Sequence, residues 1–251
     1  VPVVAEVPPI PPSARGRLLT GTQPSSFIEA YRGLRTVVDR RTPGTENGDR
    51  HGVIVVTSAG DGEGKTTTVA HLATALAEIG RSVLVISADL RRPCLHLYFD
   101  RSRDPGLVDV LTGAPGAPAL ADLDLTTGIQ GVRFLSSGAP VDNPAPLLEH
   151  AGDVLGAARS LCDVVLVDSP PLLMASDAAV LARHADGVLL VVRAGRTSIG
   201  AATRSAELLQ RLDIPVLGAV LVASDSAPNS TRSPRRLSNW SVRSRPRRPT
   251  V

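Results

Sequence analysis

Short apolar runs alternate with longer amphipathic segments between residues 51 and 222. Five runs rich in valine, leucine and isoleucine predict strands at Val53–Thr57, Ser82–Ile86, Val164–Val167, Gly187–Val192 and Val216–Val222. The alanine- and leucine-rich segments between them predict helices at Lys65–Ile79, Leu147–Leu161, Ala175–Ala185 and Ile199–Leu212. Residues 101–138 are less regular, with a short helix expected at Gly106–Gly113 and a strand at Val132–Leu135. This alternation indicates an α/β fold with a mostly parallel central sheet flanked by helices on both faces.

The two ends of the chain differ from this central pattern. Five prolines among the first twelve residues exclude a regular helix, so we interpret residues 1–24 as a proline-rich linker. Apolar residues then recur at helical spacing over residues 25–41, which predicts an amphipathic helix at the start of a domain that covers residues 25–223. Residues 224–251 hold seven arginines, seven serines and few apolar residues, so we expect a disordered tail.

Composition excludes several classes of protein. None of the apolar runs approaches the ~20 residues that span a bilayer. We also expect no secretory signal. The two cysteines, Cys94 and Cys162, lack metal-type spacing, which indicates a reducing, cytosolic compartment. The net charge is +3, and the arginines of the tail more than account for it. A solvated tail is the simplest interpretation, with attraction to an anionic membrane or to nucleic acid as the alternative.

A glycine-rich turn joins the first predicted strand of the domain to the helix that begins at Lys65. It comprises Ser58, Ala59, Gly60, Asp61, Gly62, Glu63, Gly64, Lys65, Thr66 and Thr67. Glycines let successive backbone N–H groups turn inward around phosphate oxygens, and the N-terminus of a helix favours an anion. Lys65, the only lysine of the chain, adds a positive charge, and Thr66 offers a hydroxyl to Mg²⁺. We therefore expect residues 60–67 to bind ATP, although Ala59 occupies the first glycine position of the general pattern.

Magnesium-bound phosphate also needs carboxylates at the carboxyl ends of neighbouring parallel strands. Asp168 ends the apolar run at Val164–Val167 and is followed by Ser-Pro-Pro, so it is the stronger candidate. Asp89 lies just past another predicted strand, where a simple turn residue is an equally good interpretation. The predicted metal ligands are Thr66, Asp89 and Asp168, and the predicted catalytic residues are Lys65, Asp89 and Asp168.

Together these segments resemble the bacterial tyrosine kinases of the capsular exopolysaccharide family, the BY-kinases, over residues 25–222. Ser58–Thr66 is similar to the Walker A motif of that family, Val83–Pro93 to its Walker A′ motif and Asp168–Pro171 to its Walker B motif. Gly106–Gly113 and Asn143–Leu148 are further similar stretches. The resemblance implies a P-loop NTPase fold and an ATP- and Mg²⁺-dependent protein-tyrosine kinase that regulates capsular or exopolysaccharide biosynthesis and export.

The resemblance also implies partners and a location. Family members work with a membrane polysaccharide co-polymerase, fused upstream or separate, at the cytoplasmic face of the membrane. This context favours a membrane contact over nucleic acid for the tail. Glu29, Arg32 and Arg35 match the segment through which family members assemble into rings. A solvated charged helix face is the alternative for these three residues.

Two departures from the family pattern bear on activity. The first aspartate of the Walker A′ motif is Ser87, and a serine lacks the charge and basicity of a carboxylate. Family kinases usually end in a tyrosine cluster, whereas the only tyrosines here are Tyr31 and Tyr98. A catalytically weak nucleotide-binding scaffold of the same family is therefore the alternative function. A Par/Min-type positioning ATPase is disfavoured, because the second lysine of that group's motif corresponds to Gly60.

Overall fold

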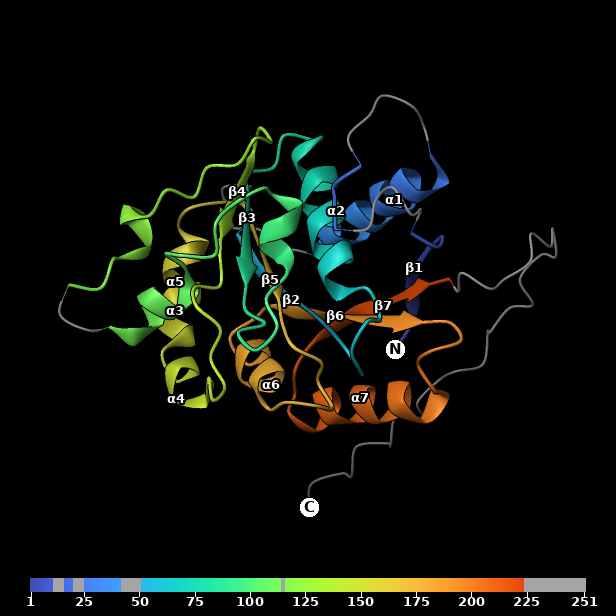
Figure 1. The fold of residues 1–251 in the computed structure, drawn as a ribbon. Helices are drawn as coiled ribbons and strands as arrows, with labels where there is room; N and C mark the ends of the chain where they lie inside the picture. Colours follow the sequence, from blue (N-terminus) through green and yellow to red (C-terminus); the bar gives the residue numbers. More distant parts are fainter. Residues whose placement is uncertain (11–15, 20–24, 42–50, 114–115, 224–251) are drawn as a thin grey trace, which may run out of the picture.

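Within the part of the chain that the structure describes, seven strands form one sheet in which every pair of neighbours is parallel (Figure 1). The computed structural model describes residues 1–10, 16–19, 25–41, 51–113 and 116–223. The strands are β1 (Val3–Val7), β2 (Gly52–Ser58), β3 (Val83–Ser87), β4 (Val132–Leu135), β5 (Val164–Asp168), β6 (Gly187–Arg193) and β7 (Val216–Val222). Their order is β1-β7-β6-β2-β5-β3-β4. This arrangement confirms the predicted α/β fold.

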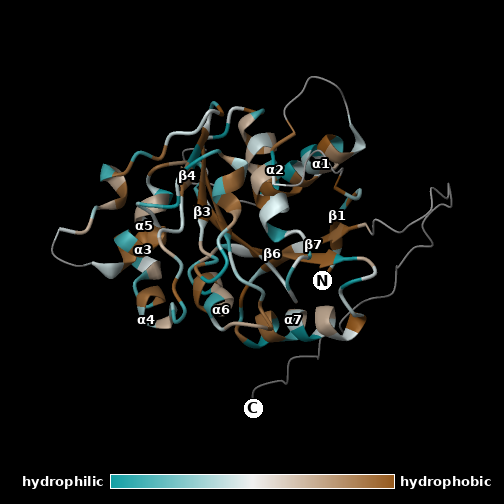
Figure 2. Ribbon diagram, viewed as in Figure 1, coloured by the Kyte–Doolittle hydropathy of each residue, from teal (hydrophilic) through white to brown (hydrophobic). Residues whose placement is uncertain are grey.

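Helices cover both faces of the sheet and bury its alternating side chains. They are α1 (Ser26–Arg41), α2 (Lys65–Ala77), α3 (Leu107–Thr112), α4 (Ala145–Leu148), α5 (Ala151–Arg159), α6 (Asp177–Ala182) and α7 (Ile199–Arg211), with short 3₁₀ turns at Leu95–Tyr98 and Leu120–Asp122. In β2, Ile54 packs into a core with α1 and α2, whereas Val53 packs into a second core with α3–α7. The hydrophobic colour in Figure 2 accordingly concentrates in the sheet. Because both faces are buried, the strands read as continuous apolar runs.

One predicted helix is divided in two. The segment expected at Leu147–Leu161 forms α4 and α5, which are interrupted at Glu149 and His150. Apolar residues of both helices, including Leu148 and Leu155, contribute to the same core. Periodicity alone therefore does not reveal the break. The helix expected at Ala175–Ala185 is also shorter than predicted, since α6 spans Asp177–Ala182.

The interpretation of residues 1–24 as a linker is wrong for Val3–Val7. These residues form β1, an edge strand parallel to β7, and Val7 is 1% exposed. Val4 lies against Gly218, where an added Cβ would meet Val4 Cγ1 at 2.2 Å. Prolines bound the strand on both sides, and an edge strand tolerates them because one of its edges pairs with no neighbour. The predicted disordered tail at residues 224–251 lies outside the described residues.

Candidate functional site

The glycine-rich turn follows β2 and leads directly into α2. Gly62 and Gly64 have φ values of +69° and +106°, which side chains rarely adopt. Ser58 Oγ donates to the Gly60 carbonyl at 2.7 Å. Glu63 is 3% exposed, and its Oε2 accepts a hydrogen bond from the Ala59 amide at 3.0 Å. The carboxylate of Glu63 therefore stabilises the loop by bonding to its backbone. Because this side chain is engaged within the loop, Glu63 would contact phosphate only through its backbone.

The structure brings Thr66 and Asp168 together across 102 residues of sequence. Thr66 Oγ1 donates to Asp168 Oδ2 at 2.8 Å, and Asp168 lies beside Val56 of β2 in the parallel ladder. Lys65, at the start of α2, is 7% exposed and Asp168 is 1% exposed. Burial raises the pKa of Asp168 to about 7, although the charge of Lys65 and the hydrogen bond from Thr66 act in the opposite direction.

Two buried oxygens at this site, one of them from Asp168 itself, are suited to bind a cation. Asp168 Oδ1 and Ser87 Oγ are buried and have no hydrogen-bond partner among the described residues. A buried polar oxygen without a partner costs free energy, and a bound Mg²⁺ with its waters would supply the missing interaction. Thr66 and Asp168 offer the hydroxyl and carboxylate oxygens that Mg²⁺ prefers. These residues therefore fit the predicted ion.

After burial, the charge of Asp89 also contributes to the raised pKa of Asp168, and a role of Asp89 as a second metal ligand stays a prediction. The Arg92 amide donates to Asp89 Oδ1 at 3.1 Å, so Asp89 also has the turn role that was the alternative. Arg92 Nη1 reaches Asp61 Oδ2 at 3.0 Å and joins this turn to the glycine-rich loop. Its neighbour Arg91 pairs instead with the buried Asp177 at 2.9 Å.

Two arginines that the sequence analysis missed contact backbone carbonyls of the loop. Arg196 Nε donates to the Asp61 carbonyl at 2.8 Å, and Arg193 Nη1 donates to the Gly62 carbonyl at 3.2 Å. Both residues lie where β6 ends, at the same edge of the sheet as the loop. A position at a strand end does not by itself reveal the contact with the loop.

The predicted ring residues form ion pairs within the chain. Arg32 pairs with Glu29 at 2.6 Å and with Glu78 of the α2 C-cap at 2.8 Å. Arg35 reaches the same Glu78 at 2.7 Å and the Ala75 carbonyl at 3.0 Å. The charged face of α1 therefore forms ion pairs that link this helix to α2. Contact of these residues with another subunit stays a prediction.

The two tyrosines differ in exposure. Tyr31 is 2% exposed, and burial raises its pKa. It packs against Phe27 and His71 in the core between α1 and α2. Tyr98 is partly exposed, and its hydroxyl lies 2.8 Å from Thr67 Oγ1. The side chain of Thr67 is therefore directed toward Tyr98, which leaves the backbone of Thr67 for the predicted nucleotide.

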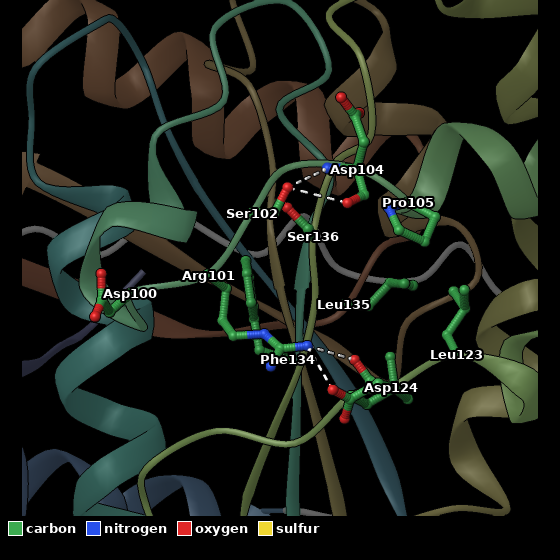
Figure 3. A pocket seen from close by; sticks show the side chains of 11 residues that line it. Asp100, Arg101, Ser102, Asp104, Pro105, Leu123, Asp124, Phe134, Leu135 and Ser136 are labelled. Carbon is green, nitrogen blue, oxygen red and sulfur yellow. Dashed lines mark hydrogen bonds and ion pairs between the residues drawn. The ribbon is translucent and has the colours of Figure 1, made fainter.

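A separate cavity of about 280 Å³ lies beside the carboxyl end of β4 (Figure 3). Arg101 crosses part of it to reach Asp124 at 3.0 Å, and Ser102 and Ser136 lie on another side. None of the predicted site residues lines this cavity. Among the described helices, none combines the length and the apolar character that crossing a membrane requires.

Comparison with known protein sequences places the loop in a family context. The profile of the CobQ/CobB/MinD/ParA nucleotide binding domain matches residues 54–233. The putative tyrosine-protein kinase EpsB of Ralstonia solanacearum is 36% identical over 207 residues, which cover 82% of this chain and 26% of EpsB. Tyrosine-protein kinase YwqD of Bacillus subtilis is 33% identical over 203 residues, which cover 80% of this chain and 83% of YwqD. The chain thus spans about a quarter of EpsB but most of YwqD.

Solved structures show the same likeness. The kinase domain of Escherichia coli tyrosine kinase ETK superposes with a TM-score of 0.76 at 29% identity and covers 92% of this chain and 94% of that domain. The septum site-determining protein MinD of Pyrococcus horikoshii, complexed with Mg-ADP, gives a TM-score of 0.59 at 26% identity over 67% of this chain and 69% of MinD.

Proposed function

Because the chain belongs to the bacterial tyrosine-protein kinases of the CobQ/CobB/MinD/ParA nucleotide-binding family, we propose that it is an ATP- and Mg²⁺-dependent protein-tyrosine kinase domain. The observation that carries the proposal is the pair formed by Thr66 and Asp168 at 2.8 Å, beside the loop that ends in the only lysine. A hydroxyl and a carboxylate beside a phosphate loop form the usual holder of Mg²⁺ in P-loop enzymes.

Each residue of this site has a distinct task in the proposed reaction. The backbone amides of residues 60–67 and the Lys65 ammonium bind the phosphates of ATP. Thr66 and Asp168 would hold Mg²⁺, which would neutralise negative charge on the phosphates. Asp89 takes the proton from the acceptor hydroxyl, whose oxygen bonds to the γ-phosphorus while ADP leaves. Phosphoryl transfer depends mainly on such positioning and charge stabilisation.

The acceptor tyrosine is proposed to lie outside residues 1–251. Tyr31 is buried in the core, and the Tyr98 hydroxyl is hydrogen-bonded to Thr67. Residues 224–251 contain no tyrosine. Phosphorylation of Tyr31 would require α1 to leave α2, at the cost of the core contacts between them. A tyrosine outside these residues is therefore the better acceptor.

A nucleotide-binding scaffold without kinase output is the second candidate. Ser87 favours it, because this residue is buried beside Asp168 and provides no carboxylate for metal or proton transfer. A site of this kind retains the phosphate loop, so it still binds nucleotide. The two candidates therefore differ in turnover rather than in ATP affinity.

The proposed partner is a membrane polysaccharide co-polymerase, at the cytoplasmic face of the membrane. Relatives named tyrosine-protein kinase EpsB and CpsD support this class of partner. The arginines of residues 224–251 would add attraction to an anionic leaflet, at about 1 kcal/mol for each residue near the surface.

Ring assembly through Glu29, Arg32 and Arg35 is part of the proposal. We expect the combined substitution Arg32→Ala and Arg35→Ala to reduce the assembled mass measured by light scattering. Glu78→Gln is the matched control, because it removes the charged partner that both arginines share within the chain but keeps the arginines themselves. Unchanged mass in the double variant would exclude the interface.

Labelled ATP tests the main proposal. The protein is incubated with labelled ATP and Mg²⁺, with and without the cytoplasmic fragment of the co-polymerase, and probed for phosphotyrosine. The kinase proposal expects a label that requires Mg²⁺ and is absent in Lys65→Met. Measurable ATP binding with no label on either protein would instead support the scaffold. Binding that survives Lys65→Met would show that the site is misplaced.

A further inference from the structure

Arg193 and Arg196 hydrogen-bond to two consecutive carbonyls of the phosphate loop. Arg196 Nε donates to Asp61 O at 2.8 Å, and Arg193 Nη1 donates to Gly62 O at 3.2 Å. The two contacts join segments that are more than 130 residues apart in the sequence. Neither arginine belongs to the Walker A, A′ or B segment, because Arg193 ends β6 and Arg196 lies three residues beyond it.

The turn that carries both arginines is itself fixed. Thr197 Oγ1 accepts a hydrogen bond from the Arg193 amide at 2.9 Å, and the Thr197 amide donates to the Arg193 carbonyl at 2.8 Å. The Arg196 amide donates to the same carbonyl at 3.1 Å. Arg193 is the last residue of β6, which pairs with β2, the strand that precedes the loop. The donors therefore have a defined position relative to the phosphate loop.

Fixing these carbonyls also fixes two amides of the loop. A peptide unit is planar and trans, so its N–H points away from its C=O. The Asp61 carbonyl shares a peptide unit with the Gly62 N–H, and the Gly62 carbonyl shares one with the Glu63 N–H. Because the arginines hold both carbonyls on one side, these two amides face the opposite side.

The packing around Gly62 supports the same arrangement. Gly62 has φ +69°, and an added Cβ would lie 2.9 Å from Arg196 Nη2. Glycine thus permits both the backbone conformation and the close approach of the guanidinium. Without a donor on the outer side, the flexible backbone at Gly62 is free to rotate its peptide planes.

We infer that Arg193 and Arg196 are positioning residues for phosphate binding, which aim the Gly62 and Glu63 amides at the phosphates of the nucleotide. The inference rests on the proposed nucleotide site and adds to it a part of the chain outside the Walker motifs. Loops organised before binding lose less entropy when the ligand arrives, so the arginines raise affinity without touching the ligand.

Substitutions at Arg196 separate hydrogen bonding from charge. Arg196→Gln places an amide N–H₂ where the Arg196 Nε lies and removes the charge, whereas Arg196→Met keeps the length without a donor. We expect Arg196→Met to weaken binding of the fluorescent nucleotide mant-ADP with Mg²⁺ on the order of tenfold, as loss of one charge-assisted hydrogen bond predicts. Arg196→Gln should recover most of that affinity. Arg204→Met, at an exposed position of α7, is the matched control and should bind as the unaltered protein does.

Three results would overturn the inference, and they are distinguishable. If Arg196→Met and Arg193→Met bind mant-ADP like Arg204→Met while Lys65→Met does not bind, the nucleotide site stands and the positioning role is wrong. If the unaltered protein does not bind mant-ADP, both the site and the inference fail. Equal losses in Arg196→Gln and Arg196→Met would assign the effect to charge and also contradict the positioning role. Melting temperatures of the variants identify any loss that comes from unfolding.

Discussion

Ser87 and Asp168 are register partners at the carboxyl ends of β3 and β5. Each is 1% exposed, and each has a side-chain oxygen without a hydrogen-bond partner among the described residues. A carboxylate at residue 87 would therefore face Asp168 across one step of the ladder. The departure from the family pattern lies within the proposed magnesium site, so it bears on metal binding as well as on proton transfer.

Ser87→Asp should increase phosphotransfer and make the protein more dependent on Mg²⁺. Two buried carboxylates repel each other without a cation, so we expect a lower melting temperature in the absence of Mg²⁺ and a larger rise when it is added. Phosphotyrosine formation should rise at saturating ATP, because a well-placed base typically contributes about 10²-fold or more. Ser87→Asn is the control of similar size without charge. No rise in activity for Ser87→Asp would show that the missing carboxylate does not limit turnover.

The raised pKa of Asp168 predicts that Mg²⁺ binding depends on pH. Below a pKa of about 7, the ion competes with a proton, so its affinity should fall by up to about tenfold per pH unit. Without Mg²⁺, the folded state holds this proton more tightly than the unfolded chain does. Stability should therefore decrease as pH rises from about 4 to about 7.

Asp168→Asn tests both parts of that prediction. The variant should lose the stabilisation by Mg²⁺ in thermal melts at pH 6 and pH 8. Its metal-free melting temperature at pH 8 should equal or exceed that of the unaltered protein, because a buried charge is removed. If Mg²⁺ raised the melting temperature of the unaltered protein equally at pH 6 and pH 8, the ion would have to bind elsewhere.

The sequence predicts the centre of the site better than its surroundings. Thr66 and Asp168 were identified because a glycine-rich turn and a strand-end carboxylate leave local signals, and the parallel sheet brings strand ends together. The contact of Arg196 with Asp61 and that of Arg32 with Glu78 depend on tertiary packing, and many exposed arginines share the same local pattern. β1 was missed for a related reason, since its five residues become a strand only by pairing with β7.

Docking of β1 can be tested at Gly218. Gly218→Ala would place a methyl 2.2 Å from Val4 Cγ1, at a φ of +157° that side chains rarely adopt, so we expect the free energy of unfolding to fall by about 1–3 kcal/mol in urea titrations. Gly156→Ala in α5 is the matched control, because an added Cβ there meets no atom within 4 Å. It should stabilise the protein by about 0.5–1 kcal/mol. Equal effects of the two substitutions would mean that β1 contributes little to the fold.

Lys65→Arg should abolish nucleotide binding although it conserves the charge. Lys65 is 7% exposed at the point where the loop enters α2, and a slim ammonium fits there. A guanidinium is a broad planar fork and cannot occupy the same space without displacing the loop. Titration with mant-ADP should show no saturation, while Arg204→Lys, at an exposed position of α7, should bind normally. Normal binding by Lys65→Arg would show that a positive charge at residue 65 suffices for nucleotide binding. It would also show that the loop can move to accommodate a guanidinium despite its contacts with Arg193 and Arg196.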